Sequence, residues 1–222
     1  MIDTLRTDPE LEKITKYIPK DEMVIYKVKV SSENESIIPI YIWDGFVLKE
    51  EDLLKIIREH ENLNIIPVEK TFENKYAALS WVYQNILKYR NLTPQRKKYF
   101  VGKRYEAEKM SHGGFRGNQH SSSSDFIPKY ERTRKKVANE TETSESYVKN
   151  AYEFSRGVDS AESTAPGIKD LILSGSIKRR DGDIASIARA TSKERQNLID
   201  DLTRKKDSCK FCSKRCPLCS KH

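Results

Sequence analysis

Apolar positions alternate with polar ones along the first third of the chain and recur at helical spacing further on. The alternation predicts strands over 24–30, 37–43, 46–48 and 65–68. Asp44-Gly45 is a turn signal that joins the second and third of these strands into a hairpin, and Pro67 favours a sheet edge for the fourth. Helical spacing predicts helices over 7–17 and 74–88 and around 53–57. Together these elements predict a small α+β domain over 1–92.

Start and stop signals predict that the remainder of the chain is helical. Thr93 is placed to cap, and Pro94 to begin, a basic connecting helix over 93–110. The Gly/Ser-rich stretch over 111–125 predicts a flexible linker. Three late helices are expected over 168–174, 184–190 and 192–206, with Gly175 closing the first and Asp181 or Asp183 capping the second. The predicted fold class is an α+β N-terminal domain followed by an all-α domain over 126–206.

The stretch from Arg134 to Glu153 has the pattern of a helix-turn-helix. Ala138 supplies the small residue that two crossing helices need, and three apolar residues hold the crossing together: Val137, Val148 and Ala151. Ser144 is a natural N-cap for the second helix. Glu142 occupies the turn position that usually holds Gly, and we expect a differently shaped turn because a non-Gly residue at positive φ is strained. An ordinary helix hairpin in an all-α domain is the alternative.

Charge is distributed unevenly and favours a polyanionic partner for the second part of the chain. Residues 1–80 hold 11 Lys/Arg against 16 Asp/Glu, whereas residues 81–222 hold 30 against 17. Each Lys or Arg set against a phosphate releases counterions, so a polyanion is the simplest partner. The helix-turn-helix lies within the basic part of the chain, which favours duplex DNA as that polyanion. The predicted DNA contacts are Arg134, Lys135, Lys136, Ser144, Ser146, Tyr147, Lys149 and Asn150 in the helix-turn-helix, and Arg96, Lys97, Lys103 and Arg104 in the connecting helix.

The order of these pieces resembles the ParB-like partition and DNA-binding proteins. The residues that carry the resemblance are the run 90–96 (R-N-L-T-P-Q-R), the run 102–105 (G-K-R-Y), Glu108-Lys109, and the helix-turn-helix after a Gly-rich gap. The resemblance implies a ParB/sulfiredoxin-like N-terminal domain, a central helix-turn-helix domain and a dimer that binds a DNA site. A partition ATPase is a further candidate partner.

Many members of that family bind and hydrolyse CTP through a Gly- and Arg-containing motif after the Asp-Gly hairpin. This chain departs from that pattern with Lys49-Glu50-Glu51-Asp52, which holds three carboxylates and neither glycine nor arginine. Carboxylates repel a triphosphate, and without glycine the backbone cannot approach it closely. We therefore expect a degenerate N-terminal domain that does not bind CTP. Asp44 and the three carboxylates could instead bind a divalent metal, although a helix N-terminus favoured by its dipole explains them more simply.

All four cysteines lie in the last 14 residues. Cys209, Cys212, Cys216, Cys219 and His222 form C-x2-C-x3-C-x2-C-x2-H within a basic tail over 207–222. Two C-x2-C pairs can hold one tetrahedral zinc ion, although the three-residue spacing between the pairs is shorter than in ordinary zinc fingers. A tail without metal is the equal alternative.

The sequence as a whole predicts a cytoplasmic, non-enzymatic protein that binds specific double-stranded DNA, in partition of a plasmid or chromosome or in transcriptional control. No apolar run approaches the roughly 20 residues of a membrane span, and the first ten residues lack a signal-peptide core. Two alternatives stay open. One is an enzyme, either a CTP-dependent switch or a nuclease, and the other is a protein-interaction module with a vestigial helix-turn-helix.

Overall fold

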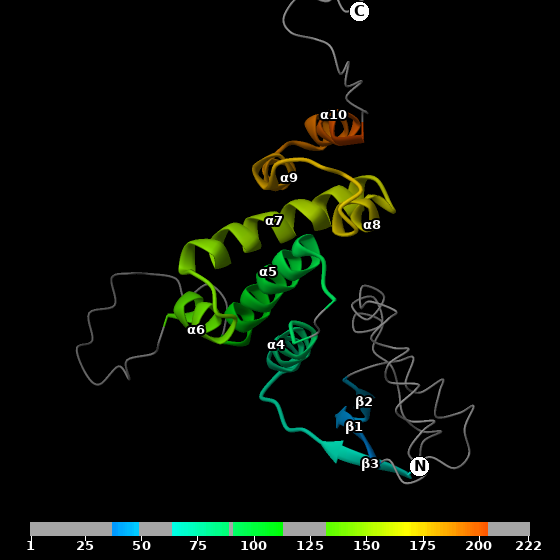
Figure 1. The fold of residues 1–222 in the computed structure, drawn as a ribbon, viewed down its shortest axis with the longest axis vertical. Helices are drawn as coiled ribbons and strands as arrows, with labels where there is room; N and C mark the ends of the chain where they lie inside the picture. The colour runs from blue at the N-terminus through cyan, green and yellow to red at the C-terminus, as the bar shows by residue number, and fades with distance from the viewer. Residues whose placement is uncertain (1–36, 49–63, 89–90, 113–131, 204–222) are drawn as a thin grey trace, which may run out of the picture.

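The computed structural model describes residues 37–48, 64–88, 91–112 and 132–203 (Figure 1). Over these ranges the chain is mostly helical and carries a small three-stranded sheet, so the fold is of the mixed α+β class. The elements predicted over 7–17, 24–30 and around 53–57 lie outside the described residues.

The sheet contains the hairpin that the sequence predicts. Its strands are β1 (Ile37–Trp43), β2 (Phe46–Val47) and β3 (Asn64–Glu69), in the order β2-β1-β3. β1 and β2 are antiparallel, and the two turn residues between them, Asp44 and Gly45, both have positive φ. A two-residue turn of this kind matches the twist of the flanking strands. β3 runs parallel to β1 and is the outer strand among the three that the structure describes, as Pro67 indicates.

Seven helices follow in the described part of the chain. They are α4 (Lys75–Ile86), α5 (Pro94–Ser111), α6 (Thr133–Glu140), α7 (Glu145–Thr164), α8 (Ile168–Leu173), α9 (Asp181–Ile187) and α10 (Ser192–Thr203). The expected N-caps of α5 and α7 are confirmed, because the hydroxyls of Thr93 and Ser144 accept hydrogen bonds from the first turns of those helices. The expected cap of α9 is wrong. Arg180 is the N-cap, while Asp181 and Asp183 lie inside the first turn, where the helix dipole favours a carboxylate.

One large apolar core connects the sheet to the helices. It runs from Leu48 at the end of the hairpin to Leu202 on α10, with Phe100 of α5 and Phe154 of α7 fully buried between them. Trp81 of α4 joins the sheet side through edge and tilted ring contacts to Tyr41 and Phe72. α4 and α5 therefore pack into the same core as α7, across the domain boundary predicted at residue 92.

Two glycines set how closely the long helices approach one another. A Cβ added at Gly102 of α5 would lie 2.2 Å from the carbonyl oxygen of Ala151 on α7. One added at Gly157 of α7 would lie 2.1 Å from the carbonyl oxygen of Ile184 on α9. Side chains larger than hydrogen would push these helices apart, because protein interiors leave no space for the extra atom. α5 and α9 thus both lie directly on the α7 backbone (Figure 1).

Candidate nucleic-acid interface

α6 and α7 pack through the apolar residues that the sequence pattern predicts. Val137, Ala138, Val148 and Ala151 are all buried, and Val101 of α5 completes their cluster. The small side chain at residue 138 allows the two helices to cross closely. The helix pair is therefore held by its own apolar cluster and rests on α5 as a third element.

Glu142 adopts the left-handed conformation in the turn between these helices, with φ at +54°. The amide of Glu142 donates to the carbonyl of Asn139, and the amide of Thr143 donates to the carbonyl of Ala138. This pair of bonds is the Schellman arrangement that closes a helix, in which the left-handed position usually holds Gly. The expectation of a differently shaped turn is thus wrong. The turn keeps its ordinary shape, and Glu142 bears the backbone strain.

The exposed face of α7 begins directly after this turn. Ser146, Lys149 and Asn150 are exposed, as expected. Tyr147 differs from expectation, because its ring is half-buried and has the ammonium group of Lys98 5.5 Å from its centroid. Burial, together with the nearby carboxylate of Asp181, raises the pKa of the Tyr147 hydroxyl. Tyr147 therefore packs against α5 and does not stand on the free face.

The basic residues of α6 differ in their surroundings: some face solvent, and one is paired with a buried carboxylate. Lys135 is exposed and Arg134 is half-buried. Lys136 instead donates to the carboxylate of Glu108 on α5, which also accepts a 2.6 Å hydrogen bond from the hydroxyl of Ser80 on α4. Burial would raise the pKa of Glu108, but Lys136 and Ser80 outweigh it and hold that pKa below its ordinary value. The group joins α4, α5 and α6 around one negative charge.

Two predicted phosphate contacts on α5, Lys103 and Arg104, form ion pairs with carboxylates of the protein itself. The side chain of Arg104 is only 2% exposed and forms an ion pair with Glu140 of α6. Lys103 forms ion pairs with Glu106 and, at 3.1 Å, with Asp159 of α7. Burial would lower the pKa of Lys103, but Asp159 and Glu106 raise it above its ordinary value. The expectation for Arg104 is corrected, because a guanidinium group with a 2% exposed side chain, already paired with Glu140, is not accessible to a DNA phosphate.

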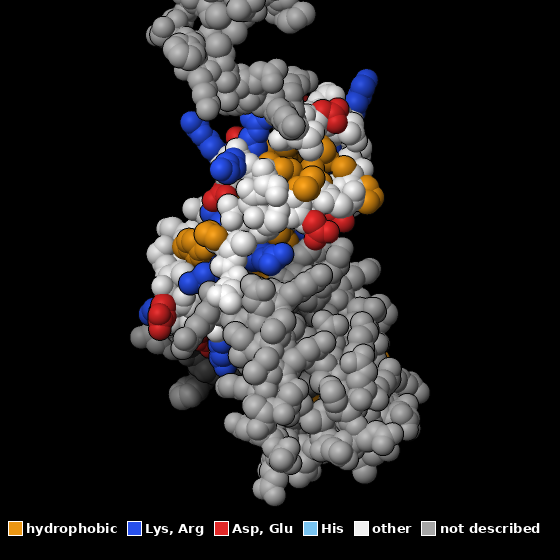
Figure 2. All heavy atoms as spheres, turned by 45° about the vertical axis from the view of Figure 1, so that its right-hand side comes forward, with side chains coloured by type: hydrophobic (Ala, Val, Ile, Leu, Met, Phe, Trp, Pro, Cys, Tyr) orange, Lys and Arg blue, Asp and Glu red, His pale blue; other side chains and the backbone are white. Residues whose placement is uncertain are grey.

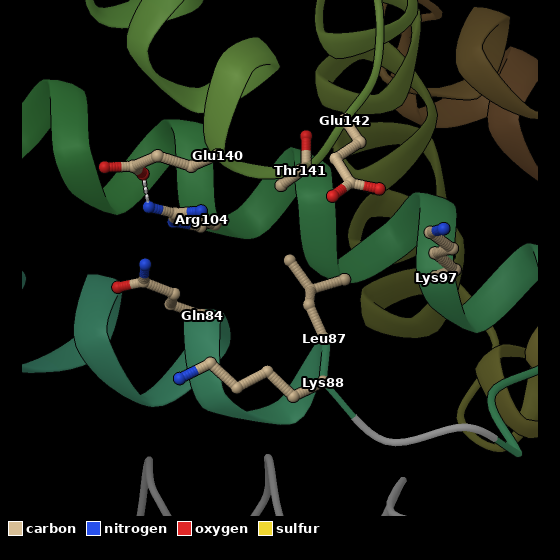
Figure 3. Close-up of a pocket in the computed structure, with 8 residues that line it drawn as sticks. All are labelled: Gln84, Leu87, Lys88, Lys97, Arg104, Glu140, Thr141 and Glu142. Atoms are coloured by element: carbon tan, nitrogen blue, oxygen red, sulfur yellow. Dashed lines mark ion pairs between the residues drawn. The ribbon is translucent and has the colours of Figure 1, made fainter.

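The remaining α5 cations, Arg96 and Lys97, differ in access. Lys97 is exposed, whereas Arg96 is half-buried, and its Nε finds no hydrogen-bond partner among the described residues. Lys97 lines a cavity of about 200 Å³ between α4, α5 and the turn (Figure 3). The lining residues are Gln84, Leu87, Lys88, Lys97, Arg104, Glu140, Thr141 and Glu142. Three cations and two carboxylates leave this cavity with little net charge.

The acidic run 49–52 and the five metal-ligand candidates of the tail lie outside the described residues. Over the described ranges, three or more His, Cys, Asp or Glu side chains do not gather into a group that could hold a metal ion. None of the helices that the structure describes is both long and apolar enough to cross a membrane.

No protein-family model matches the chain, and no curated protein or solved structure is significantly similar to it.

Proposed function

We propose that this protein binds specific sequences in double-stranded DNA, with α7 as the recognition helix. The observation that carries the proposal is the α6–turn–α7 unit. Its buried cluster and helix-closing turn fix the two helices, and its exposed face holds Ser146, Lys149 and Asn150. A helix presented in this way fits the major groove, which admits one α-helix.

Base reading falls to the first turns of α7. Asn150 can pair in a bidentate manner with adenine, and Lys149 can donate to the acceptor edge of guanine. Both side chains are exposed. Ser144 and Ser146 are also exposed and are suited to phosphate or base contacts, in addition to the cap that Ser144 provides.

Phosphate contacts that set the position of the protein fall to α6. Arg132 and Lys135 are exposed at its start, and Arg134 is half-buried beside them. The first helix of such a unit crosses the DNA backbone, so these cations would meet phosphates without reading sequence. The uneven charge of the chain supports the same partner, with 30 Lys/Arg against 17 Asp/Glu after residue 80.

We further propose a ParB-like, non-enzymatic role in partition or transcriptional control, with the protein acting in the cytoplasm as a homodimer. The support is the order of the sequence pieces together with the helix-turn-helix. In partition, an ATPase would be its partner. In this proposal the N-terminal domain holds no CTP, because the run 49–52 is acidic.

A protein-interaction module is the second candidate, and the acidic residues near the start of α7 favour it. Glu142 and Glu145 are exposed there, and Asp181 of α9 lies close enough to raise the pKa of Tyr147. Carboxylates repel phosphates, so this surface would suit a basic protein segment instead.

Selection of bound duplexes from a random-sequence library tests the proposal. We expect enrichment of a short motif, and binding whose log affinity falls with log salt at a slope near −5 if about six phosphates are neutralised. Absence of enrichment together with salt-independent binding would favour the protein-interaction module.

A further inference from the structure

Basic side chains continue along α7 beyond the residues assigned to base reading. Lys149, Glu153 and Arg156 stand four and three residues apart, so they share one face of the helix. Lys149 and Arg156 are exposed. Arg156 is supported by the ring of Tyr152, whose centroid lies 5.7 Å from the guanidinium carbon.

α9 brings a third cation to this face. Gly157 allows α9 to lie directly on the α7 backbone. Arg189 comes directly after the end of α9 and is therefore held next to α7. The guanidinium group of Arg189 lies 3.5 Å from the carboxylate of Glu153, and its side chain is 69% exposed. We call Lys149, Arg156 and Arg189 the α7–α9 strip. Figure 2 shows exposed Lys and Arg side chains at the level of α9 and α10.

The spacing of Lys149 and Arg156 along α7 is comparable to the depth of the groove. Seven residues separate Lys149 from Arg156, which is about 10 Å along the helix axis at about 1.5 Å per residue. The major groove is about 8.5 Å deep. When the first turn of α7 enters the groove with Lys149 at the base edges, Arg156 lies at the height of the bordering phosphates. Arg189 reaches the same region through its contact with Glu153.

We propose that Arg156 and Arg189 form a second phosphate-contact surface for duplex DNA, continuous with the recognition helix and separate from the cations of α6. This inference rests on the proposed function and extends its footprint past the first turns of α7. Glu153 lowers the positive charge of this surface, because it neutralises part of the charge of Arg189 when no DNA is bound.

The test is salt-dependent binding of the full chain to a fluorescent mixed-sequence duplex of about 20 base pairs, which is two helical turns. Arg156→Gln/Arg189→Gln should reduce the magnitude of the salt slope by about 1.8, since two phosphate contacts at about 0.9 each are lost. Arg156→Lys/Arg189→Lys keeps both positive charges and should therefore keep the wild-type salt slope. Lys109→Gln, which removes an exposed charge from the last turn of α5, should also leave it unchanged.

Glu153→Gln should change the affinity for the duplex in the opposite direction. It removes the carboxylate that pairs with Arg189, so binding should become tighter. A folded double Gln variant with the wild-type slope overturns this inference and leaves the proposed function standing. A wild-type protein that binds no duplex at low salt overturns both. Circular dichroism of each variant establishes that it is folded before its slope is compared.

Discussion

Arg104 of α5 forms an ion pair with Glu140, the last residue of α6, although almost none of the Arg104 side chain is exposed. Two of its nitrogens, Nε and Nη1, are buried and find no hydrogen-bond acceptor among the described residues. Compensation of its buried charge comes from the ion pair with Glu140 and from the nearby carboxylate of Glu108. The pair fixes the end of α6, from which the turn into α7 begins.

Removal of the carboxylate should destabilise the protein more than removal of the whole pair. Glu140→Gln leaves a buried cation without its partner, and we expect a loss of about 1–3 kcal/mol in the free energy of unfolding. Arg104→Met/Glu140→Gln should recover part of that loss, because an apolar side chain fills the same space without a charge. Urea unfolding of the single and double variants measures both values. A double variant less stable than Glu140→Gln would contradict this account.

Glu142 provides a second stability prediction, because its left-handed backbone costs about 1–2 kcal/mol for a residue with a Cβ. Glu142→Gly relieves that strain, while the added freedom of the unfolded chain offsets about 0.4–1 kcal/mol. We expect a net stabilisation of up to about 1.5 kcal/mol in thermal or urea unfolding. Glu142→Ala is the matched control, since it removes the carboxylate and keeps the strain. Equal gains from Gly and Ala would show that charge, not backbone conformation, limits the turn.

Local signals were sufficient to predict most of the elements in the described ranges. Thr93 and Ser144 cap α5 and α7 as their hydroxyls predict, and Asp44-Gly45 forms the hairpin turn. The contacts within α6–turn–α7 also follow from sequence, because Ala138 and Val148 stand at the spacing that a close crossing requires. Each of these features depends on residues near one another in the chain.

The wrong predictions for Arg104 and Tyr147 concern residues whose surroundings come from distant segments. Arg104 looked like a phosphate contact because it lies in a basic run, yet it stands four residues after Phe100 and three after Val101, on the buried face of α5. Because residues three and four apart share a face of a helix, this spacing from two apolar residues indicates that Arg104 is buried. Its partner Glu140 is not identified by any local pattern. The half-buried position of Tyr147 likewise involves a residue far away in the sequence, Lys98 of α5, whose ammonium group lies against the ring.

The free energy of unfolding should decrease as the pH is lowered, because Glu108 takes up a proton. Its pKa in the folded protein is below the ordinary value because Lys136 and Ser80 outweigh burial. As the pH falls, the unfolded chain therefore takes up this proton first, and the free energy of unfolding decreases until the folded pKa is passed. At neutral pH the contribution is fully present. Urea unfolding at a series of acidic pH values measures the decrease.

Glu108→Gln is the control for that pH dependence. It removes the titrating group but keeps an acceptor for Ser80, and it should cost about 1–3 kcal/mol at neutral pH, where the charged hydrogen bonds are lost. Below the folded pKa the difference from the wild type should shrink. A difference that stays constant across the acidic range would show that Glu108 does not titrate in the predicted manner.

The cysteine tail gives a prediction independent of the helical core. If Cys209, Cys212, Cys216 and Cys219 hold one zinc ion, the purified protein should contain about one equivalent of metal, with His222 able to replace one sulfur. The metal should be lost as pH falls, because bound thiolates must be deprotonated. Deletion of 207–222 should abolish the metal and leave the helical signal in circular dichroism unchanged. Elemental analysis without zinc or iron in metal-replete, reduced protein would leave a tail that holds no metal.

The most direct measurement compares Asn150→Ala with Lys135→Ala on the selected DNA site and on each of its single-base variants. Both side chains are exposed, but they lie on different helices of the helix-turn-helix. Asn150→Ala should lose roughly 1–3 kcal/mol of binding free energy at one base pair and relax the preference there. Lys135→Ala should weaken binding to all sequences alike and reduce the salt slope by about 1. Equal, sequence-independent losses from both variants would contradict the assignment of α7 as the recognition helix.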